Sequence, residues 1–555
     1  MTSENSFQTQ NSASRAASYL WWQRGIIYEV YPHSFMDSNG DGVGDLKGLI
    51  SRFDYLRWLG IDAVWLSPIY PSPMKDFGYD VADYTAIHPR FGTMEDFDRL
   101  VRETHAHDIK LILDFVPNHS SDQHPWFIES RSSRDNPKRD WYIWHDPAPG
   151  GGPPNNWLSN FGGGAWEYDP KTAQYYYHAF LREQPDLNWR NPQLVEAMLN
   201  VLRFWLERGV DGFRVDVLWH LIKDDQFRHN PPNPYWREGA DPYQKLLELH
   251  STDQAEVHAV VTCMRRLVDQ YQDRVLIGEI YLPVERLVQY YGIDLSGVHV
   301  PFNFQLLLAK WNARDIARII AEYEAALPKG GWPNWVLGNH DRSRIASRVG
   351  PTQARLAAML LLTLRGTPTL YYGDEIGMHD VEIQPAKVQD PFEKTVPGLG
   401  LGRDPQRTPM QWTAAKNAGF TEGEPWLPIA EDYPQINVET ERDDPFSMLS
   451  LYSRLIKVRR CESALEVGVL EPVETTGDLL SYVRRDGESA FLVALNFGTK
   501  PETLNISGKG FEGRITLSTW LNRSADSVRG DLYIRPEEGL LVRLLTQTQS
   551  GDVLI

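Results

Sequence analysis

The chain has 555 residues, and 56 Lys and Arg against 74 Asp and Glu give it a formal net charge of −18. This acidic balance excludes sequence-independent binding to nucleic acid, which needs a basic surface to displace phosphate counterions. The hydrophobic content of 42% excludes intrinsic disorder. No run of 18 or more apolar residues predicts a membrane span, so we expect neither nucleic acid nor membrane as a partner.

The first 18 residues are polar and lack the apolar core of a secretory signal, so we predict a flexible N-terminal tail on a cytoplasmic protein. The two cysteines, Cys263 and Cys461, lie far apart and show no metal-binding spacing. We expect them to be two buried free thiols, which fits a reducing compartment.

Eight apolar, strand-like segments follow the tail and alternate with amphipathic helical patterns. The expected strands cover residues 25–31, 63–67, 110–116, 212–216, 275–280, 298–303, 335–339 and 367–373. The helical patterns cover residues 46–60, 93–108, 193–208, 256–271, 313–326, 352–364 and 446–460. Apolar strands alternating with helices predict a parallel sheet. Eight such units, with no GxGxxG loop after the first strand, favour an α/β fold of the (β/α)₈ TIM-barrel type over an open sheet.

Two irregular stretches interrupt the alternation. Residues 120–185 have no helical period and are rich in Pro, Gly, Asn and aromatic residues, which predicts an inserted domain after strand three. Residues 375–440 form an irregular subdomain between strand eight and its helix. Short alternating segments then predict a C-terminal antiparallel β-sandwich domain over 465–555. The barrel itself is assigned to residues 19–119 and 186–464.

Three of the predicted strands end in, or run into, a carboxylate: Asp216, Glu279 and Asp341. Active sites of (β/α)₈ barrels lie at the C-terminal ends of the strands. One such residue could be an isolated ion pair or a cap, but three at one mouth call for a chemical reason, because buried charges are costly. Two carboxylates that face one bond are the machinery of glycoside hydrolysis.

Four motifs on these strands resemble those of the α-amylase superfamily: DFVPNH (114–119), GFRVD (212–216), GEI (278–280) and GNHD (338–341). Two further segments resemble its α-glucosidase and oligo-1,6-glucosidase branch: QPDLNW (184–189) and RTPMQW (407–412). The resemblance spans residues 20–540. It implies a retaining α-glucoside enzyme with a barrel, an inserted domain after strand three and a C-terminal β domain.

The resemblance also implies roles for matching residues in the reaction. Asp216 would be the nucleophile, Glu279 the general acid/base, and Asp341 the stabiliser of the transition state. Arg214 would keep the nucleophile ionised by its charge and hydrogen bonds.

Further residues are expected to bind the sugar. The resemblance implies that His119 and His340 hold hydroxyl groups of the ring in the cleaved subsite. A second histidine near His119, His124, could suggest a metal pair, but this spacing on a loop is poor ligand geometry.

The turn DFGYD (76–80) resembles the family's sugar-binding turn, in which Tyr79 would stack on glucose and Asp76 would bind its 4- or 6-hydroxyl. Arg407 would close over the non-reducing end together with Asp76 and make the enzyme exo-acting; Arg403 is the less favoured residue for this role. Phe161 matches an aromatic residue that lines the pocket. Ordinary packing remains the alternative for Tyr79 and Phe161.

Residues 37–45, DSNGDGVGD, place oxygen-bearing side chains at alternate positions of a tight loop, as Ca²⁺ loops do. Residue 48 is Gly where an EF-hand needs Glu, so an EF-hand is excluded. The family resemblance implies instead a structural Ca²⁺ site, with Mg²⁺ as the alternative cation. Its ligands would be Asp37, Asn39, Asp41, the Val43 carbonyl and Asp45. A metal-free, solvated Asx turn stays open.

The sequence is least informative about which glycosidic linkage is preferred. In the resembling family Val after the nucleophile, here Val217, accompanies α-1,6 bonds, but the following residues 218–224 depart from that pattern. Residues 224–236 are expected to border the aglycone site. We predict an exo-acting α-glucosidase for short maltose-type oligosaccharides, as a monomer or homodimer, with transfer to a sugar or alcohol left open.

Three alternatives remain. The first is an oligo-1,6-glucosidase, and the second is a sucrose or trehalose isomerase, which would share every catalytic residue. The third is a non-catalytic sugar-binding or transport-accessory relative, which would be expected to have lost one of the three carboxylates.

Overall fold

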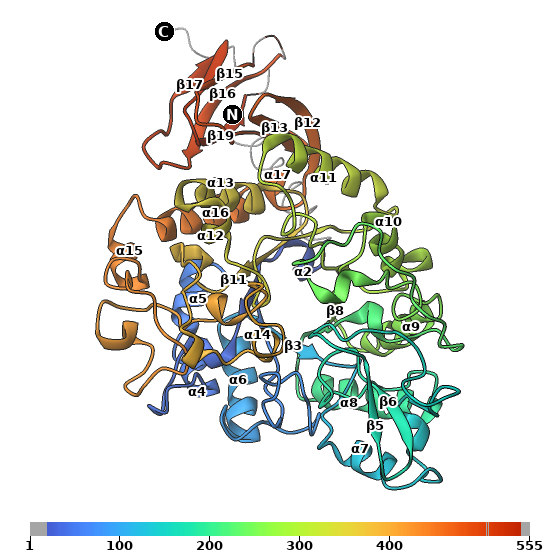
Figure 1. Ribbon diagram of the computed structural model, residues 1–555. Coiled ribbons are helices and arrows are strands. Elements are labelled where there is room, and N and C mark those ends of the chain that lie inside the picture. The colour runs from blue at the N-terminus through green and yellow to red at the C-terminus, as the bar shows by residue number, and fades with distance from the viewer. Residues whose placement is uncertain (1–18, 507, 509, 546–555) are drawn as a thin grey trace, which may run out of the picture.

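The computed structural model describes residues 19–506, 508 and 510–545, so the predicted tail at 1–18 lies outside the described residues. Its centre is a parallel sheet of eight strands in the order β10-β11-β1-β2-β3-β7-β8-β9 (Figure 1). Among the described strands, pairing links each neighbour in this order and leaves β9 and β10 as the two ends, so the barrel is nearly closed and the predicted fold class is confirmed. The strands are β1 (Ile27–Val30), β2 (Ala63–Leu66), β3 (Lys110–Phe115), β7 (Gly212–Val215), β8 (Val275–Gly278), β9 (Val300–Pro301), β10 (Asn334–Val336) and β11 (Thr367–Tyr371).

Helices surround this sheet and follow the predicted patterns closely. The longer ones are α6 (Met94–Ala106), α8 (Pro192–Glu207), α9 (Val257–Val268), α11 (Ala313–Ala326), α13 (Pro351–Thr363) and α16 (Met448–Cys461). Side-chain caps fix several of their starts: Thr93 caps α6, Asn191 caps α8 and Asn312 caps α11. The shorter helices are α2 (Trp21–Arg24), α3 (Pro32–Phe35), α4 (Leu46–Ile50), α5 (Phe53–Leu59), α10 (Val284–Leu287), α12 (Ile345–Val349), α14 (Pro391–Thr395), α15 (Val438–Asp443) and α17 (Ser463–Glu466).

Two predicted elements differ from the structure. The single helical pattern at 46–60 is two helices, α4 and α5, which meet at Ser51 and Arg52. The strand expected at 298–303 shortens to Val300–Pro301. Proline has no backbone N–H and cannot continue a ladder, which explains why β9 ends there.

The inserted segment forms a small unit beside the barrel. It holds a three-stranded antiparallel sheet in the order β4-β6-β5, with β4 (Trp144–His145), β5 (Trp166–Asp169) and β6 (Gln174–Tyr177). The expectation of no helix in this stretch is wrong at α7 (Pro125–Ser130), where His124 caps the first turn and proline opens it. Hydrogen bonds from Asn156 Nδ2 to the Asn230 carbonyl at 2.8 Å and from Trp157 Nε1 to the Arg228 carbonyl at 2.9 Å join this unit to the loop after β7.

The C-terminal domain is antiparallel, as predicted. A six-stranded sheet runs in the order β12 (Val469–Thr476), β13 (Leu479–Asp486), β14 (Ser489–Asn496), β19 (Gly539–Leu544), β16 (Glu512–Ser518), β17 (Ser527–Arg529). A two-stranded sheet pairs β15 (Glu502–Asn505) with β18 (Asp531–Ile534). The domain sits above α13 and α16 (Figure 1). Buried Arg484 links it to the barrel by donating to the carbonyls of Thr363 and Gly468.

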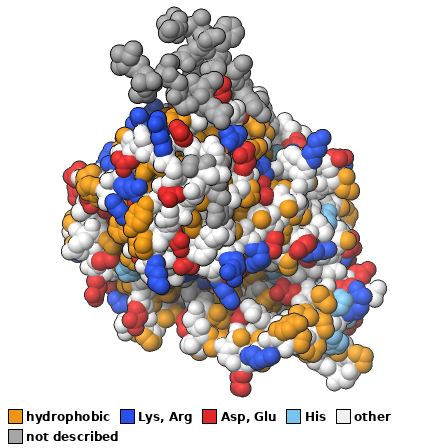
Figure 2. Space-filling model, turned by 90° about the horizontal axis from the view of Figure 1, so that it is seen from above, with side chains coloured by type: hydrophobic (Ala, Val, Ile, Leu, Met, Phe, Trp, Pro, Cys, Tyr) orange, Lys and Arg blue, Asp and Glu red, His pale blue; other side chains and the backbone are white. Residues whose placement is uncertain are grey.

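The surface corrects one prediction. Both cysteines are exposed free thiols, on the outward sides of α9 and α16, so the expectation that Cys263 and Cys461 are buried is wrong. Acidic and basic side chains are interspersed over the face shown in Figure 2. Within the described ranges, no helix has the length and apolar character that a bilayer crossing requires.

Candidate active site

The site is organised around one buried arginine at the C-terminal end of the barrel. Arg214 on β7 lies beside Asp114 on β3 in the sheet register. Its Nη1 donates to both carboxylate oxygens of Asp114 at 2.8 Å and to Asp216 Oδ1 at 2.8 Å. Its Nη2 lies 2.7 Å from Oε2 of Glu279. One guanidinium, only 1% exposed, therefore contacts three carboxylates.

The two carboxylates of the predicted catalytic pair come directly after neighbouring strands. Asp216 follows β7, and Glu279 follows β8. Between them the backbone of Val217 turns into the left-handed region, with φ +37°, and its N–H donates to Glu279 Oε2 at 2.8 Å. This conformation is strained for a β-branched residue, and such strain is typical of functional sites.

Burial raises the pKa of both Asp216 and Glu279 above their ordinary values, while the charge of Arg214 opposes that rise. Two carboxyl groups this close titrate as a pair, since each negative charge disfavours the other. This coupling favours one carboxylate beside one carboxylic acid, which is the combination that a nucleophile and a general acid require.

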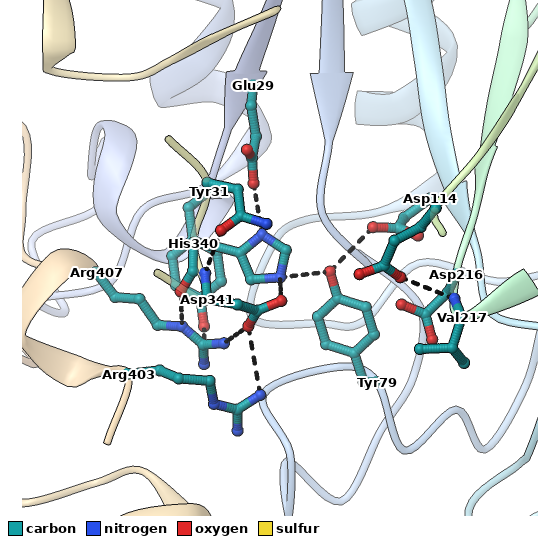
Figure 3. A network of polar contacts seen from close by, with 12 residues as sticks. Glu29, Tyr31, Tyr79, Asp114, Asp216, Val217, His340, Asp341, Arg403 and Arg407 are labelled. Atoms are coloured by element: carbon teal, nitrogen blue, oxygen red, sulfur yellow. Dashed lines mark hydrogen bonds and ion pairs between the residues drawn. The ribbon is translucent and has the colours of Figure 1, made fainter. Parts of the chain in front are cut away.

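Asp341, the third predicted carboxylate, lies five residues beyond the end of β10 and faces two arginines (Figure 3). Arg407 Nη2 donates to Asp341 Oδ1 at 2.8 Å, and Arg403 Nη1 lies 3.5 Å from the same oxygen. Burial would raise the pKa of Asp341, but the charges of the two arginines help to lower it below its ordinary value. Asp341 is therefore ionised.

His340 connects this carboxylate to the sugar-binding turn. Its Nδ1 lies 2.5 Å from Glu29 Oε1, and its Nε2 lies 2.8 Å from the hydroxyl of Tyr79 (Figure 3). The Tyr79 ring stacks on the imidazole with centroids 5.5 Å apart and donates its hydroxyl to Asp114 Oδ2 at 3.0 Å. Burial lowers the pKa of His340 well below its ordinary value, so the ring is neutral.

Sequence reasoning missed Glu29 and left Asp114 out of the site. Glu29 lies on β1 and is fully buried. The signal was present, since Glu29 is the one charged residue of the apolar segment 25–31. Asp390, a third missed residue, gave no signal because it comes from the irregular stretch.

The closed end of the site corrects a second prediction. Arg403 Nη2 donates to Asp76 Oδ1 at 2.7 Å and to Asp390 Oδ1 at 2.6 Å, and its guanidinium lies 4.8 Å from the Phe161 ring. Arg407 does not contact Asp76. It is instead held over the ring of Tyr31, and donates to the carbonyl of His340 and to Asp341. The arginine that pairs with Asp76 is therefore Arg403, which was the less favoured candidate from the sequence.

His119 lies on the wall beside Tyr79. Its Nε2 is 3.2 Å from the Tyr79 carbonyl oxygen and 3.1 Å from the side-chain nitrogen of Gln184. Burial lowers the pKa of His119 to about 4, so it is neutral at physiological pH.

Most of the predicted residues share one cavity of about 1060 Å³. Those that line it are Asp76, Tyr79, His119, Phe161, Asp216, Glu279 and Asp341. Arg214, His340 and Arg407 are not among its lining residues; they lie behind it and orient the carboxylates. His340 contacts Glu29 and Tyr79, and its predicted contact with sugar hydroxyls stays a prediction.

The loop at 37–45 is a network of turns closed by side-chain oxygens. Asp37 accepts hydrogen bonds from three backbone amides and from the Thr421 hydroxyl, and Asp45 accepts from the amides of Ser38 and Gly48. Burial would raise the pKa of Asp37, but these bonds lower it. Over the part of the chain that the structure describes, no three His, Cys, Asp or Glu side chains gather into a metal-binding group. The cation stays a prediction.

Comparison with known proteins agrees with this geometry. The family model for the alpha amylase catalytic domain matches residues 29–468. The chain therefore belongs to the alpha-amylase family. It is a glycoside hydrolase of that family, and the superfamily predicted from its motifs is confirmed.

Individual relatives cover most of the chain. It is 40% identical to a probable alpha-glucosidase of Rhizobium meliloti (strain 1021), over 89% of this chain and 92% of that one. It is 39% identical to an oligo-1,6-glucosidase of Halalkalibacterium halodurans, over 86% and 91%. The crystal structure of the alpha-glucosyl transfer enzyme XgtA superposes with a TM-score of 0.90 at 38% identity, over 95% of this chain and 100% of that chain.

The closed end gives a testable electrostatic prediction. Arg403→Gln leaves the buried carboxylates of Asp76 and Asp390 without their cation, and breaking such a pair costs about 3–5 kcal/mol of unfolding free energy. Burial already raises the pKa of Asp76 and Arg403 opposes this, so in the variant that pKa rises further. At low pH, protonation of Asp76 then removes its buried charge. The decrease in unfolding free energy, measured by denaturant unfolding, should therefore be larger at pH 8 than at pH 5.

The matched control is Arg182→Gln, because Arg182 pairs with Glu183 at the surface and its side chain is 67% exposed. This variant should change the unfolding free energy by less than about 1 kcal/mol at either pH. Equal losses for the two variants would contradict a buried role for Arg403.

Proposed function

We propose that the protein is a retaining, exo-acting α-glucosidase that releases glucose from the non-reducing end of short, maltose-type α-glucosides. The observation that carries this is the contact of one guanidinium, Arg214, with both Asp216 and Glu279 at the base of the cavity. The names of the relatives, a probable alpha-glucosidase and an oligo-1,6-glucosidase, support the substrate class.

The geometry supports a two-step displacement. In the first step the Asp216 carboxylate attacks the anomeric carbon while Glu279 gives its proton to the leaving glycosidic oxygen. The ionised Asp341 lies where it can accept hydrogen bonds from ring hydroxyls as positive charge develops. In the second step Glu279 takes a proton from water, which attacks the same carbon and frees Asp216.

The exo action follows from the closed end of the cavity. The ion pair between Asp76 and Arg403, covered by the Phe161 ring, forms a wall beyond the Tyr79 platform. A longer chain could not extend past this wall. We therefore expect that only the terminal glucose of a substrate reaches Asp216.

Product analysis on maltose, isomaltose, sucrose and trehalose tests the proposal. We expect glucose from maltose, appearing first as the α-anomer by NMR, because two displacements retain configuration. Faster cleavage of isomaltose would favour the α-1,6 alternative that Val217 suggests. Rearranged sucrose or trehalose would indicate an isomerase, and no cleavage or transfer of any α-glucoside would contradict the proposal.

Two substitutions separate the catalytic roles. Glu279→Gln should lower kcat/KM on maltose by about 10²–10⁴, the usual contribution of a general acid. With p-nitrophenyl α-glucoside, the same variant should lose less of the rate of the first step, because the p-nitrophenolate leaving group needs little protonation. Asp216→Asn should lose both activities by orders of magnitude.

Glu95→Gln, on the exposed surface of α6, is the control and should retain activity on both substrates. If Asp216→Asn kept most of its activity, the nucleophile would have to be another residue.

We also propose that the loop at 37–45 holds a structural Ca²⁺, or Mg²⁺, through the residues predicted from the sequence. The burial of two of these carboxylates supports this. Asp37 and Asp45 are only 4% and 6% exposed, and among the described residues no ion pair with a cationic side chain balances either of them.

Removal of the cation is the test. Chelation should lower the unfolding free energy by about 2.7 kcal/mol relative to protein in Ca²⁺ at 100 times its dissociation constant. The measurements are Tm and the metal content of the dialysed protein, with Asp41→Ala as the variant that should weaken binding. An unchanged Tm and no bound metal would contradict the site.

Further parts of the proposal concern the setting of the enzyme. We propose that it works in the cytoplasm, as a monomer or homodimer. The two exposed free thiols support a reducing compartment, where they would remain reduced.

A further inference from the structure

The outer part of the active-site cavity is lined by leucines from separate loops. Leu247 and Leu249 come from the loop between β7 and α9, and Leu308 comes from the segment after β9. These three side chains are 36%, 61% and 57% exposed, although leucine side chains favour burial. Leu282, after β8, and Leu401 line the same cavity.

The acidic side chains of this outer part are engaged with neighbours in the chain. Asp253 accepts hydrogen bonds from Arg286 Nε and from the Tyr290 hydroxyl, both at 2.7 Å. Asp380 accepts from the Ser343 hydroxyl at 2.5 Å and from the Arg344 amide at 2.8 Å. These groups are therefore occupied by structural contacts.

The basic side chains there are also engaged. Arg348 donates to the carbonyls of Ser343 at 3.0 Å and Leu307 at 2.7 Å. Arg342 lies over the ring of Tyr281, 5.3 Å from its centroid. Both arginines are therefore engaged with groups of the protein itself.

Two aromatic side chains line the same cavity as the leucines and the reacting groups. Tyr281, two residues after Glu279, stacks on Phe304 with centroids 4.1 Å apart, and it lies 5.8 Å from the ring of Trp219. Tyr281 and Trp219 both line the cavity. The general acid, these two aromatic rings and the leucines therefore line one cavity.

We infer that the aglycone site accepts an apolar group, such as an alkyl chain, on the far side of the scissile bond from glucose. The inference rests on the proposed function and names the leaving-group class of that same site. As the bond from the anomeric carbon to the alkyl oxygen breaks, Asp216 bonds to the carbon and the Glu279 proton passes to the oxygen. The product leaves as a neutral alcohol, whose chain lies against the leucines.

A series of n-alkyl α-glucosides, from methyl to octyl at concentrations below micelle formation, tests this contact. A fully buried methylene is worth about 0.8 kcal/mol, so half of that burial gives about a twofold gain in kcat/KM per methylene. We expect kcat/KM to rise roughly sixteenfold from butyl to octyl, which is about twofold for each added methylene. Maltose, measured in parallel, reports the proposed function separately.

Leu249→Ser and Leu308→Ser should flatten the dependence on chain length. Both side chains are more than half exposed, so the substitutions should not disturb folding, which an unchanged Tm would confirm. Ile128→Ser, on α7 outside the cavity, is the matched control because Ile128 is also 57% exposed. It should keep the full dependence.

The outcomes are distinct. A chain-length dependence that the two leucine variants reduce and the control keeps would support the inference. Cleavage of maltose with kcat/KM constant from methyl to octyl would overturn it and leave the proposed function standing. A dependence unchanged in Leu249→Ser and Leu308→Ser would also overturn it. Failure to cleave maltose and every alkyl glucoside would overturn both.

Discussion

The contact of Arg214 with Asp114, Asp216 and Glu279 is the constraint on which the rest of the site depends. Three carboxylates could not be buried at one end of a barrel without a cation, because each charge would repel the others in a medium of low dielectric. The guanidinium offers donors in a planar fork, so it can fix several oxygens at once. Its register opposite Asp114 on the neighbouring strand sets where that fork lies.

Hydrogen bonds extend outward from the carboxylates that Arg214 contacts. Asp114 also accepts the hydroxyl of Tyr79, which meets the imidazole of His340, which in turn meets Glu29 on the first strand. With Arg214 on β7, Asp114 on β3 and Glu29 on β1, strands of the barrel contribute to one continuous polar network, part of which is drawn in Figure 3. Such networks hold reacting groups in place because each member is fixed by the next.

Strand-and-helix alternation made the barrel predictable, and the position of Asp216 and Glu279 at strand ends made the chemistry predictable. These inferences rest on local patterns that the fold must respect. The contacts of Arg403 and Arg407 were not predictable in the same way. Both come from an irregular stretch without periodicity, so only the three-dimensional path of the chain decides which arginine meets Asp76.

The solvent exposure of the cysteines was also difficult to predict from the sequence. A free cysteine is usually buried, but on an amphipathic helix its position relative to the core face decides. Cys263 lies on α9 outside the buried face that includes Val260 and Met264. Composition alone could not reveal this, whereas the phase of the helical pattern around Cys263 could have done so.

The two ends of the cavity differ in how freely they can change during evolution. At the closed end, Asp76, Arg403 and Asp390 are buried and mutually paired, so replacing any one leaves an unmatched charge and the three must change together. At the open end, exposed leucines come from independent loops and have no polar partner to lose. Each can be exchanged alone at little cost to folding. Recognition of glucose is therefore fixed, while the choice of what glucose is attached to can drift one residue at a time.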